Sequence, residues 1–475
     1  LPREIRDIIY EFYVAQENGY IFDADTGRFK GADRPIEMAL LLMCKRVADE
    51  MEGMALRVNV LTFTTSSSRS LHSQAARFDE IMGRLHFVRA KRLDQMRDLI
   101  PPDLSKDLEN RFPRSFTQQL CQTGLRCYNS SQGAWGEVES NHREFVRYAL
   151  QQLSSTHPVE FSTAITEPIG YLCERHSEIS YPGVLSSSTE PWAIPTDKEL
   201  DCLEAICPPS AWLTQTDHRL DFRFSAAAVA IRFLESMTTC TRLHIRKIVL
   251  REDRKSSAFP ACHGEGLIPF CIENPRLRVE RRVDMWRAIF PPPLRLLERI
   301  WKLRDDPDEI DGVHELPIGD SVMHISEWVG ETLVLASRSM PPSSYSLVFD
   351  SESAESTQEV FDTLKVEAQL LDAMTEHGKQ DGSYTRHWKL QYPYVYYSHS
   401  LPTIVKEIIQ GTSIIRFDAL VGESWSWDLD QLKREWKGIT FEEWETKRFP
   451  NRIEYLSTMP PMPKWIDIQL DYILP

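Results

Sequence analysis

The amino-acid sequence predicts a mixed α/β (α+β) protein: a small helical N-terminal module, a helical middle and a C-terminal layer of alternating strands and helices. Three observations lead to this class. Apolar residues recur at helical spacing from Ile5 to Phe12, and again between Phe78 and Val88. Apolar and polar residues alternate with the strand period at Leu220–Phe224. In the second half, such strands alternate with helical stripes, which indicates a sheet covered by helices.

The first helix is the clearest element. Its apolar residues follow the i, i+3, i+4, i+7, i+8 spacing of one helical face: Ile5, Ile8, Ile9, Phe12 and Tyr13. Pro2 suits the first turn of a helix, where its missing N–H removes no hydrogen bond. We expect most of this stripe to pack on Leu41 and Cys44 as the core of the first domain.

The remaining N-terminal half predicts a hairpin, a strand and then helices. Tyr20–Lys30 reads as a hairpin around a turn at Asp23–Gly27, and Arg57–Thr64 reads as a strand. Residues 66–155 are mostly helical in pattern. Residues 156–196 are rich in Ser, Pro and Thr, and we expect loops or a linker there. The expected organisation is therefore a module at 1–65, a helical region at 66–155, a linker at 156–196 and a mixed α/β domain at 197–475.

The C-terminal part supplies the expected strands and helix starts. Strands are predicted at Leu220–Phe224, Ile245–Leu250, Tyr345–Phe349 and Ile466–Leu474. Ser225 can cap a following helix, and Ser356–Glu359 has the form of a capping box. No repeat of fixed period occurs, which argues against a regular solenoid or propeller.

Composition narrows the class of partner. The net charge of −15 disfavours non-specific binding to nucleic acid. No apolar run approaches the roughly 20 residues of a membrane span. Nine cysteines, an odd number without framework spacing, favour reduced thiols. We therefore expect an intracellular protein, cytoplasmic or nuclear, with no membrane partner.

One stretch is locally basic. Residues 242–304 hold 15 Lys or Arg against 7 Asp or Glu. Pairing with neighbouring acidic residues is the simpler interpretation. The alternative is a basic docking patch for an acidic partner, formed by Arg251, Arg254, Lys255, Arg278, Arg281 and Arg282.

No motif of catalysis is present. The sequence lacks the phosphate-binding loop, the dinucleotide fingerprint, the nucleophile elbow and the H-E-x-x-H pair. The densest chemistry is His263 beside Glu265, with Cys271 further on, which offers an acid–base pair and a thiol. A glycine-rich turn with core thiols is the simpler interpretation of these residues. We expect no metal site and no cofactor.

Three stretches within about residues 1–65 form a recognisable pattern: Leu1-Pro-Arg-Glu-Ile-Arg-Asp-Ile-Ile-Tyr10, Leu40–Val47 and Leu61–Phe63. This pattern resembles a group of fungal F-box-like proteins that is otherwise uncharacterised. It implies a helical module that docks on a Skp-type adaptor of a cullin ubiquitin ligase, while the remaining chain selects a protein substrate. Partner contacts would come from Leu1, Pro2, Ile5, Ile9 and Tyr10.

These observations favour a non-enzymatic protein-interaction protein, with a substrate adaptor of a cullin-type ubiquitin ligase as its specific form. Two alternatives stay open. One is an enzyme of unrecognised class with a site in the α/β domain. The other is a basic-surface binder of an acidic partner.

Overall fold

The computed structural model describes residues 1–66, 68–120, 137–166, 181–207, 220–291, 315–380, 401–419 and 455–474, with residues 428 and 434. Its centre is a seven-stranded sheet in the order β2-β1-β3-β4-β5-β7-β8. The strands are β1 Tyr20–Asp23, β2 Arg28–Gly31, β3 Val60–Thr64, β4 Lys247–Glu252, β5 Arg278–Asp284, β7 Tyr345–Asp350 and β8 Ile415–Phe417. A two-stranded sheet pairs β6 Leu316–Pro317 with β9 Tyr455–Leu456. The mixed α/β class expected from the sequence is confirmed.

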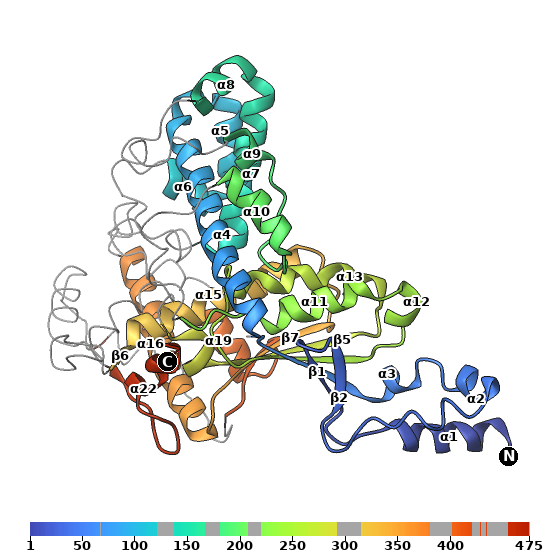
Figure 1. Ribbon diagram of the computed structural model, residues 1–475. Helices are drawn as coiled ribbons and strands as arrows, with labels where there is room; N and C mark the ends of the chain where they lie inside the picture. The colour runs from blue at the N-terminus through green and yellow to red at the C-terminus, as the bar shows by residue number, and fades with distance from the viewer. Residues whose placement is uncertain are drawn as a thin grey trace.

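The strand order nearly follows the chain. Only β2 is antiparallel, as the return strand of the β1–β2 hairpin. From β1 to β8 every neighbouring pair is parallel, and each later strand is added at the same edge. Right-handed crossovers that always advance in one direction place their helices on one side of the sheet. Accordingly, α11 (Ala226–Ser236) and α13 (Ile268–Glu273) lie on the same side, above the strands in Figure 1.

This arrangement gives the sheet two different faces. In β5 the side chains of Val279, Arg281 and Val283 are buried, while the alternating Arg278 and Glu280 are exposed or half-buried. The buried side chains face the helices. On the opposite face β5 presents Arg278, Glu280 and Arg282.

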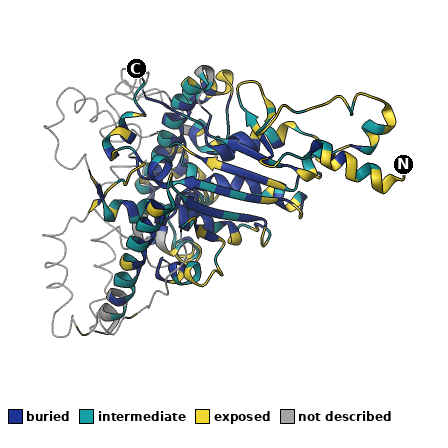
Figure 2. Cartoon of the chain, turned by 90° about the horizontal axis from the view of Figure 1, so that it is seen from below, coloured by how far each residue is buried: buried dark blue, intermediate teal, exposed yellow. Residues whose placement is uncertain are grey.

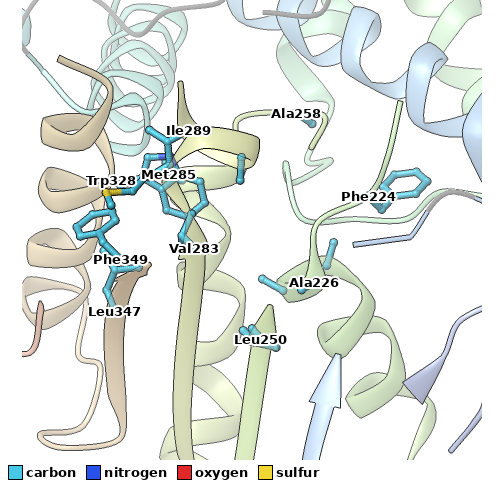
Figure 3. Close-up of a cluster of buried hydrophobic side chains, with 14 of the residues drawn as sticks. Phe224, Ala226, Leu250, Ala258, Val283, Met285, Ile289, Trp328, Leu347 and Phe349 are labelled. Carbon is cyan, nitrogen blue, oxygen red and sulfur yellow. The ribbon is translucent and has the colours of Figure 1, made fainter. Parts of the chain in front are cut away.

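The main core lies between the sheet and its helices. Figure 3 shows Val283, Met285 and Ile289 beside Leu347 and Phe349, with Trp328 packed over them. Trp328 belongs to α15 (Ile318–Ser337), and Met285 and Ile289 to η5 (Met285–Ile289). The remaining helices of this layer are α12 Thr239–Arg242, η4 Pro260–Leu267, α16 Ala354–Gln380, α19 Leu401–Ile409 and α22 Trp465–Leu470.

A helical arm rises from the sheet between β3 and β4 (Figure 1). It begins with α4 (Arg69–Gln95), which Ser68 caps by accepting a hydrogen bond from the amide of Leu71. A second apolar core, which includes Leu93, Leu108 and Phe145, holds the far part of the arm together. Its other helices are η1 Arg97–Leu99, α5 Pro102–Arg111, α6 Pro113–Leu120, α7 Glu139–Thr156, α8 Pro158–Thr166, α9 Tyr181–Ser186 and α10 Asp197–Ile206.

The N-terminal helices project from the opposite end of the sheet (Figure 1). They are α1 Arg3–Val14, α2 Lys45–Glu50 and α3 Met54–Val58. A small apolar cluster of Tyr10, Val14, Met51 and Met54 joins them. The expected module 1–65 is only partly separate, because β1, β2 and β3 belong to the central sheet.

Several expected elements are confirmed and others are wrong. The hairpin, the strands near Ile245 and Tyr345 and the Ser225 cap are present. Two helices, α8 and α9, occupy the segment expected to be loops. Residues 465–470 form helix α22 instead of a strand, because their apolar residues also fit the spacing of one short helical face. Leu220 and Phe224 form only isolated bridges.

The expected capping box at Ser356 is also wrong. The helix α16 starts at Ala354, and Ser353 Oγ accepts a hydrogen bond from the amide of Ser356. The Ser356 hydroxyl instead accepts a hydrogen bond from the indole of Trp286. No helix among the described residues is both long enough and apolar enough to span a bilayer.

Candidate functional site

The apolar stripe of α1 faces solvent. Ile8 is 63% and Phe12 83% exposed, and the side chains of Leu1, Ile5 and Ile9 are exposed as well. Figure 2 shows this helix largely in the colour of exposed residues. The expectation that the stripe forms the core of the first domain is therefore wrong. An exposed stripe of large apolar side chains is typical of a protein-interaction surface.

A polar network on the other face of α1 explains this orientation. Arg6 binds the Glu50 carboxylate through two nitrogens, at 2.8 and 2.6 Å. The hydroxyl of Tyr10 donates to the same carboxylate at 3.0 Å. The Arg6 hydrogen bond holds the pKa of Glu50 below its usual range. Tyr10, an expected partner contact, is only 5% exposed, and its role is to fasten α1 to α2.

The expected basic patch is divided by the pleat of the sheet. Arg251 and Arg278 are exposed, and Arg282 is half-buried on the same open face. Arg282 binds Asp350 at 3.0 Å and Glu280 at 3.2 Å. The carboxylates beside it therefore compensate much of the local positive charge.

The other members of the patch point elsewhere. Arg281 is fully buried on the helix side of β5, where it binds Glu252 at 2.7 Å and lies under the Trp328 ring. Lys255 donates to the carbonyl oxygen of Pro291 at 2.5 Å, and burial lowers its pKa to about 8. Arg254 is half-buried, 3.9 Å from Asp471. The six residues do not form one basic surface, because neighbouring residues of a strand face opposite sides.

His263 is a buried structural residue. Its Nε2 lies 2.8 Å from the carbonyl oxygen of Ala258, to which it must donate. Its Nδ1 then accepts a hydrogen bond from the Ser225 hydroxyl at 2.7 Å. Burial lowers the pKa of His263 to about 3, so the imidazole is neutral. Ser225 is itself fully buried and caps α11, so this pair has no access to a substrate.

Glu265 and Cys271 have different partners from His263. Glu265 binds Arg143 at 3.0 Å and Arg338 at 3.2 Å, which joins η4 to α7 and α15. Cys271 is buried in the main core, and burial raises its pKa to about 11, so the thiol is a weak nucleophile. Each of the three candidate catalytic residues has its own structural contacts.

A buried polar cluster that was not predicted from the sequence lies where the helical arm meets the α/β layer. His86 comes from α4, and Glu139 and His142 come from α7. The His86 Nδ1 lies 2.9 Å from Glu139 Oε1, and its Nε2 lies 3.1 Å from His142 Nδ1. Each of the three side chains is less than a tenth exposed. These three side chains are of the types that bind metal ions, and they lie close together.

Further ionisable groups of α15 surround this cluster. Glu331 accepts hydrogen bonds from the amide and hydroxyl of Ser140 at 3.0 and 2.6 Å. Burial raises the pKa of Glu331 to about 8 and that of Glu327 to about 7. One signal was visible in the sequence: the Glu139-x-x-His142 spacing places two ligand-type side chains on one helical face. Nothing local pointed to His86, because it lies on another helix.

Comparison with family models, with curated proteins and with solved structures gave no match for this chain.

Proposed function

We propose that this protein is a protein-interaction protein whose α1 face docks on a Skp-type adaptor of a cullin ubiquitin ligase. The observation that carries the proposal is the outward apolar stripe of Ile5, Ile8, Ile9 and Phe12. The choice of partner rests on the likeness of Leu1–Tyr10 to F-box-like proteins. The larger α/β domain would then select the protein substrate.

The placement of α1 supports a docking role. The β1–β2 hairpin, which separates α1 from α2 in sequence, is part of the central sheet and leaves α1 projecting (Figure 1). The Arg6–Glu50–Tyr10 network orients the helix without using its apolar stripe. Burying a large apolar side chain contributes about 1.5–3 kcal/mol. A partner helix or groove could therefore gain considerable free energy from this face.

Of the expected partner contacts, four remain in the proposal. Leu1, Pro2, Ile5 and Ile9 are exposed, and Ile8 and Phe12 join them. Tyr10 is no longer proposed as a partner contact, because its hydroxyl binds Glu50 and its ring packs in the N-terminal apolar cluster. The basic-surface alternative loses support from the pairing of Arg282 and the burial of Arg281.

Direct binding to a purified fungal Skp-type adaptor tests the proposal. The double variant Ile8→Ser/Phe12→Ser should weaken binding roughly 100-fold, since it removes about 3 kcal/mol or more of apolar burial. The variant Glu11→Ser, on another exposed face of the same helix, is the matched control and should bind like the wild type. Circular dichroism should show all three proteins folded.

Two results would count against this function. If the wild-type chain does not bind the adaptor at micromolar concentration, the ligase role is wrong. If the double variant binds as tightly as the wild type, α1 is not the docking surface even where binding occurs.

A further inference from the structure

The geometry points to a binding site for a Zn²⁺-class divalent transition metal ion, formed by His86, Glu139 and His142 inside the helical arm. One nitrogen of each imidazole and one carboxylate oxygen lie within 4.8 Å of one another. Two histidines and one carboxylate form a ligand set typical of zinc and other first-row divalent metals. The inference is independent of the proposed docking on α1.

The three side chains lie close enough to converge on one ion after rotation. Ligands held at about 2.0–2.2 Å from a tetrahedral ion are themselves about 3.4 Å apart. The two short distances involve different ring nitrogens of His86: its Nδ1 lies 2.9 Å from Glu139 and its Nε2 lies 3.1 Å from His142. An imidazole gives one nitrogen to an ion. With one ligand atom from each residue, the three atoms lie within 4.8 Å, and side-chain rotation must bring them to about 3.4 Å. Because His86 is on α4 and the other two residues are on α7, the ion would cross-link two helices of the arm.

Unpaired atoms supply the second reason. Glu139 is 1% exposed, yet neither of its carboxylate oxygens has a hydrogen-bond partner among the described residues. The Nε2 of His142, 2% exposed, is also without a partner there. A buried carboxylate without hydrogen bonds is expensive in free energy. The short His86–Glu139 distance without hydrogen-bond alignment is what two ligands of one ion show.

The neighbouring charges do not replace the ion. Arg143, one turn further along α7, interacts with Glu139 electrostatically. Its guanidinium nevertheless donates to Glu265 at 3.0 Å and to Cys262 at 3.5 Å. Glu327, from α15, is close enough for Glu139 to raise its pKa. Water is the source we expect for the fourth ligand.

Metal titration of the chelator-treated 475-residue chain tests the site. Isothermal titration with Zn²⁺ should give one equivalent bound with a Kd of about 1 μM or tighter, and Zn²⁺ should raise Tm. Co²⁺ should develop the visible absorption of a four-coordinate site. The variants Glu139→Gln and His142→Gln should each lose at least about tenfold in affinity. His157→Gln, at the end of the same helix α7, is the control and should bind like the wild type.

The alternative is that Glu139, His86 and His142 form only a hydrogen-bonded chain. Absence of stoichiometric Zn²⁺ binding by the wild-type chain would establish that alternative and overturn the inference. Unchanged affinity in both folded variants would do the same. If the variants do not fold, X-ray absorption of the Zn²⁺-loaded wild type decides. Two imidazoles and oxygen support the site, whereas any other number of imidazoles places the ion elsewhere.

Discussion

The N-terminal helix α1 and the long helix α4 carry similar apolar stripes but present them in opposite directions. In α4 the side chains of Phe78, Ile81 and Leu85 are buried against the core. In α1 the equivalent stripe faces solvent, and the side chains that point inward are Arg6, Tyr10 and Val14. The difference teaches that periodicity locates a helix but does not say whether its apolar face meets its own chain or a partner.

The N-terminal helices and the central sheet also differ in their charge pairs. Arg281 and Glu252 are completely buried within the α/β layer, whereas Arg6 and Glu50 hold the N-terminal helices together near the surface. A buried pair loses far more than a surface pair when one partner is removed, because the remaining charge is left without compensation.

The largest expected effect is at Arg281. Arg281→Ala should lower the free energy of unfolding by about 3–5 kcal/mol, because Glu252 would stay buried without its partner. Arg278→Ala, on the exposed face of the same strand, should change it by no more than about 0.5 kcal/mol. Urea unfolding measures both variants. Equal losses in the two would show that β5 does not have one buried and one open face.

The next prediction concerns the stability lost when one side chain is shortened in the apolar stripe of α4 or of α1. Leu85→Ala in α4 should cost about 2–5 kcal/mol of stability, since it leaves a cavity in the core. Ile8→Ala in α1 should cost no more than about 0.5 kcal/mol, because Ile8 is exposed. Thermal and urea unfolding give both values. A loss above 2 kcal/mol for Ile8→Ala would mean that the stripe of α1 belongs to the protein's own core.

A further effect is a pH dependence that belongs to the α/β layer and not to α1. Burial raises the pKa of Glu331 to about 8, well above its ordinary value. The folded state therefore keeps a proton that the unfolded chain releases, and stability should fall as pH rises from about 4.5 to 8. Glu331→Gln should reduce this decline in urea midpoints measured at pH 5 and pH 8.

If wild type and Glu331→Gln show the same change in stability between pH 5 and pH 8, Glu331 is ionised throughout that range in the folded protein. The hydrogen bonds from Ser140, which favour the ionised form, would then outweigh the effect of burial.

Local patterns were enough for most individual elements. The hairpin at Tyr20–Lys30 and the strand at Tyr345 were predictable because their residues carry turn and strand preferences over a few positions. The order of the strands in the sheet was harder to predict, because it depends on the direction of the crossovers, and no short segment of sequence determines that direction. The alternation of Arg281 and Arg282 could have separated buried from exposed charge, had the strand been recognised.

The functional surfaces depended on residues far apart in the chain. Glu50 decides which face of α1 turns inward, although it lies 40 residues from Tyr10. Likewise His86 meets His142 across 56 residues and two helices. Such contacts depend on tertiary packing, so they cannot be predicted from the residue spacing within either helix.

The placement of the arm has a consequence for how the chain emerges during synthesis. The strand β3 pairs with β4, and Val60 lies opposite Lys247. At about 5–20 residues per second, the ribosome needs roughly 10–40 s to deliver β4 after β3. During this interval the β3 edge has no partner on that side, which makes it a place for mispairing between nascent chains. Factors that shield nascent chains would therefore matter most while the arm is being translated.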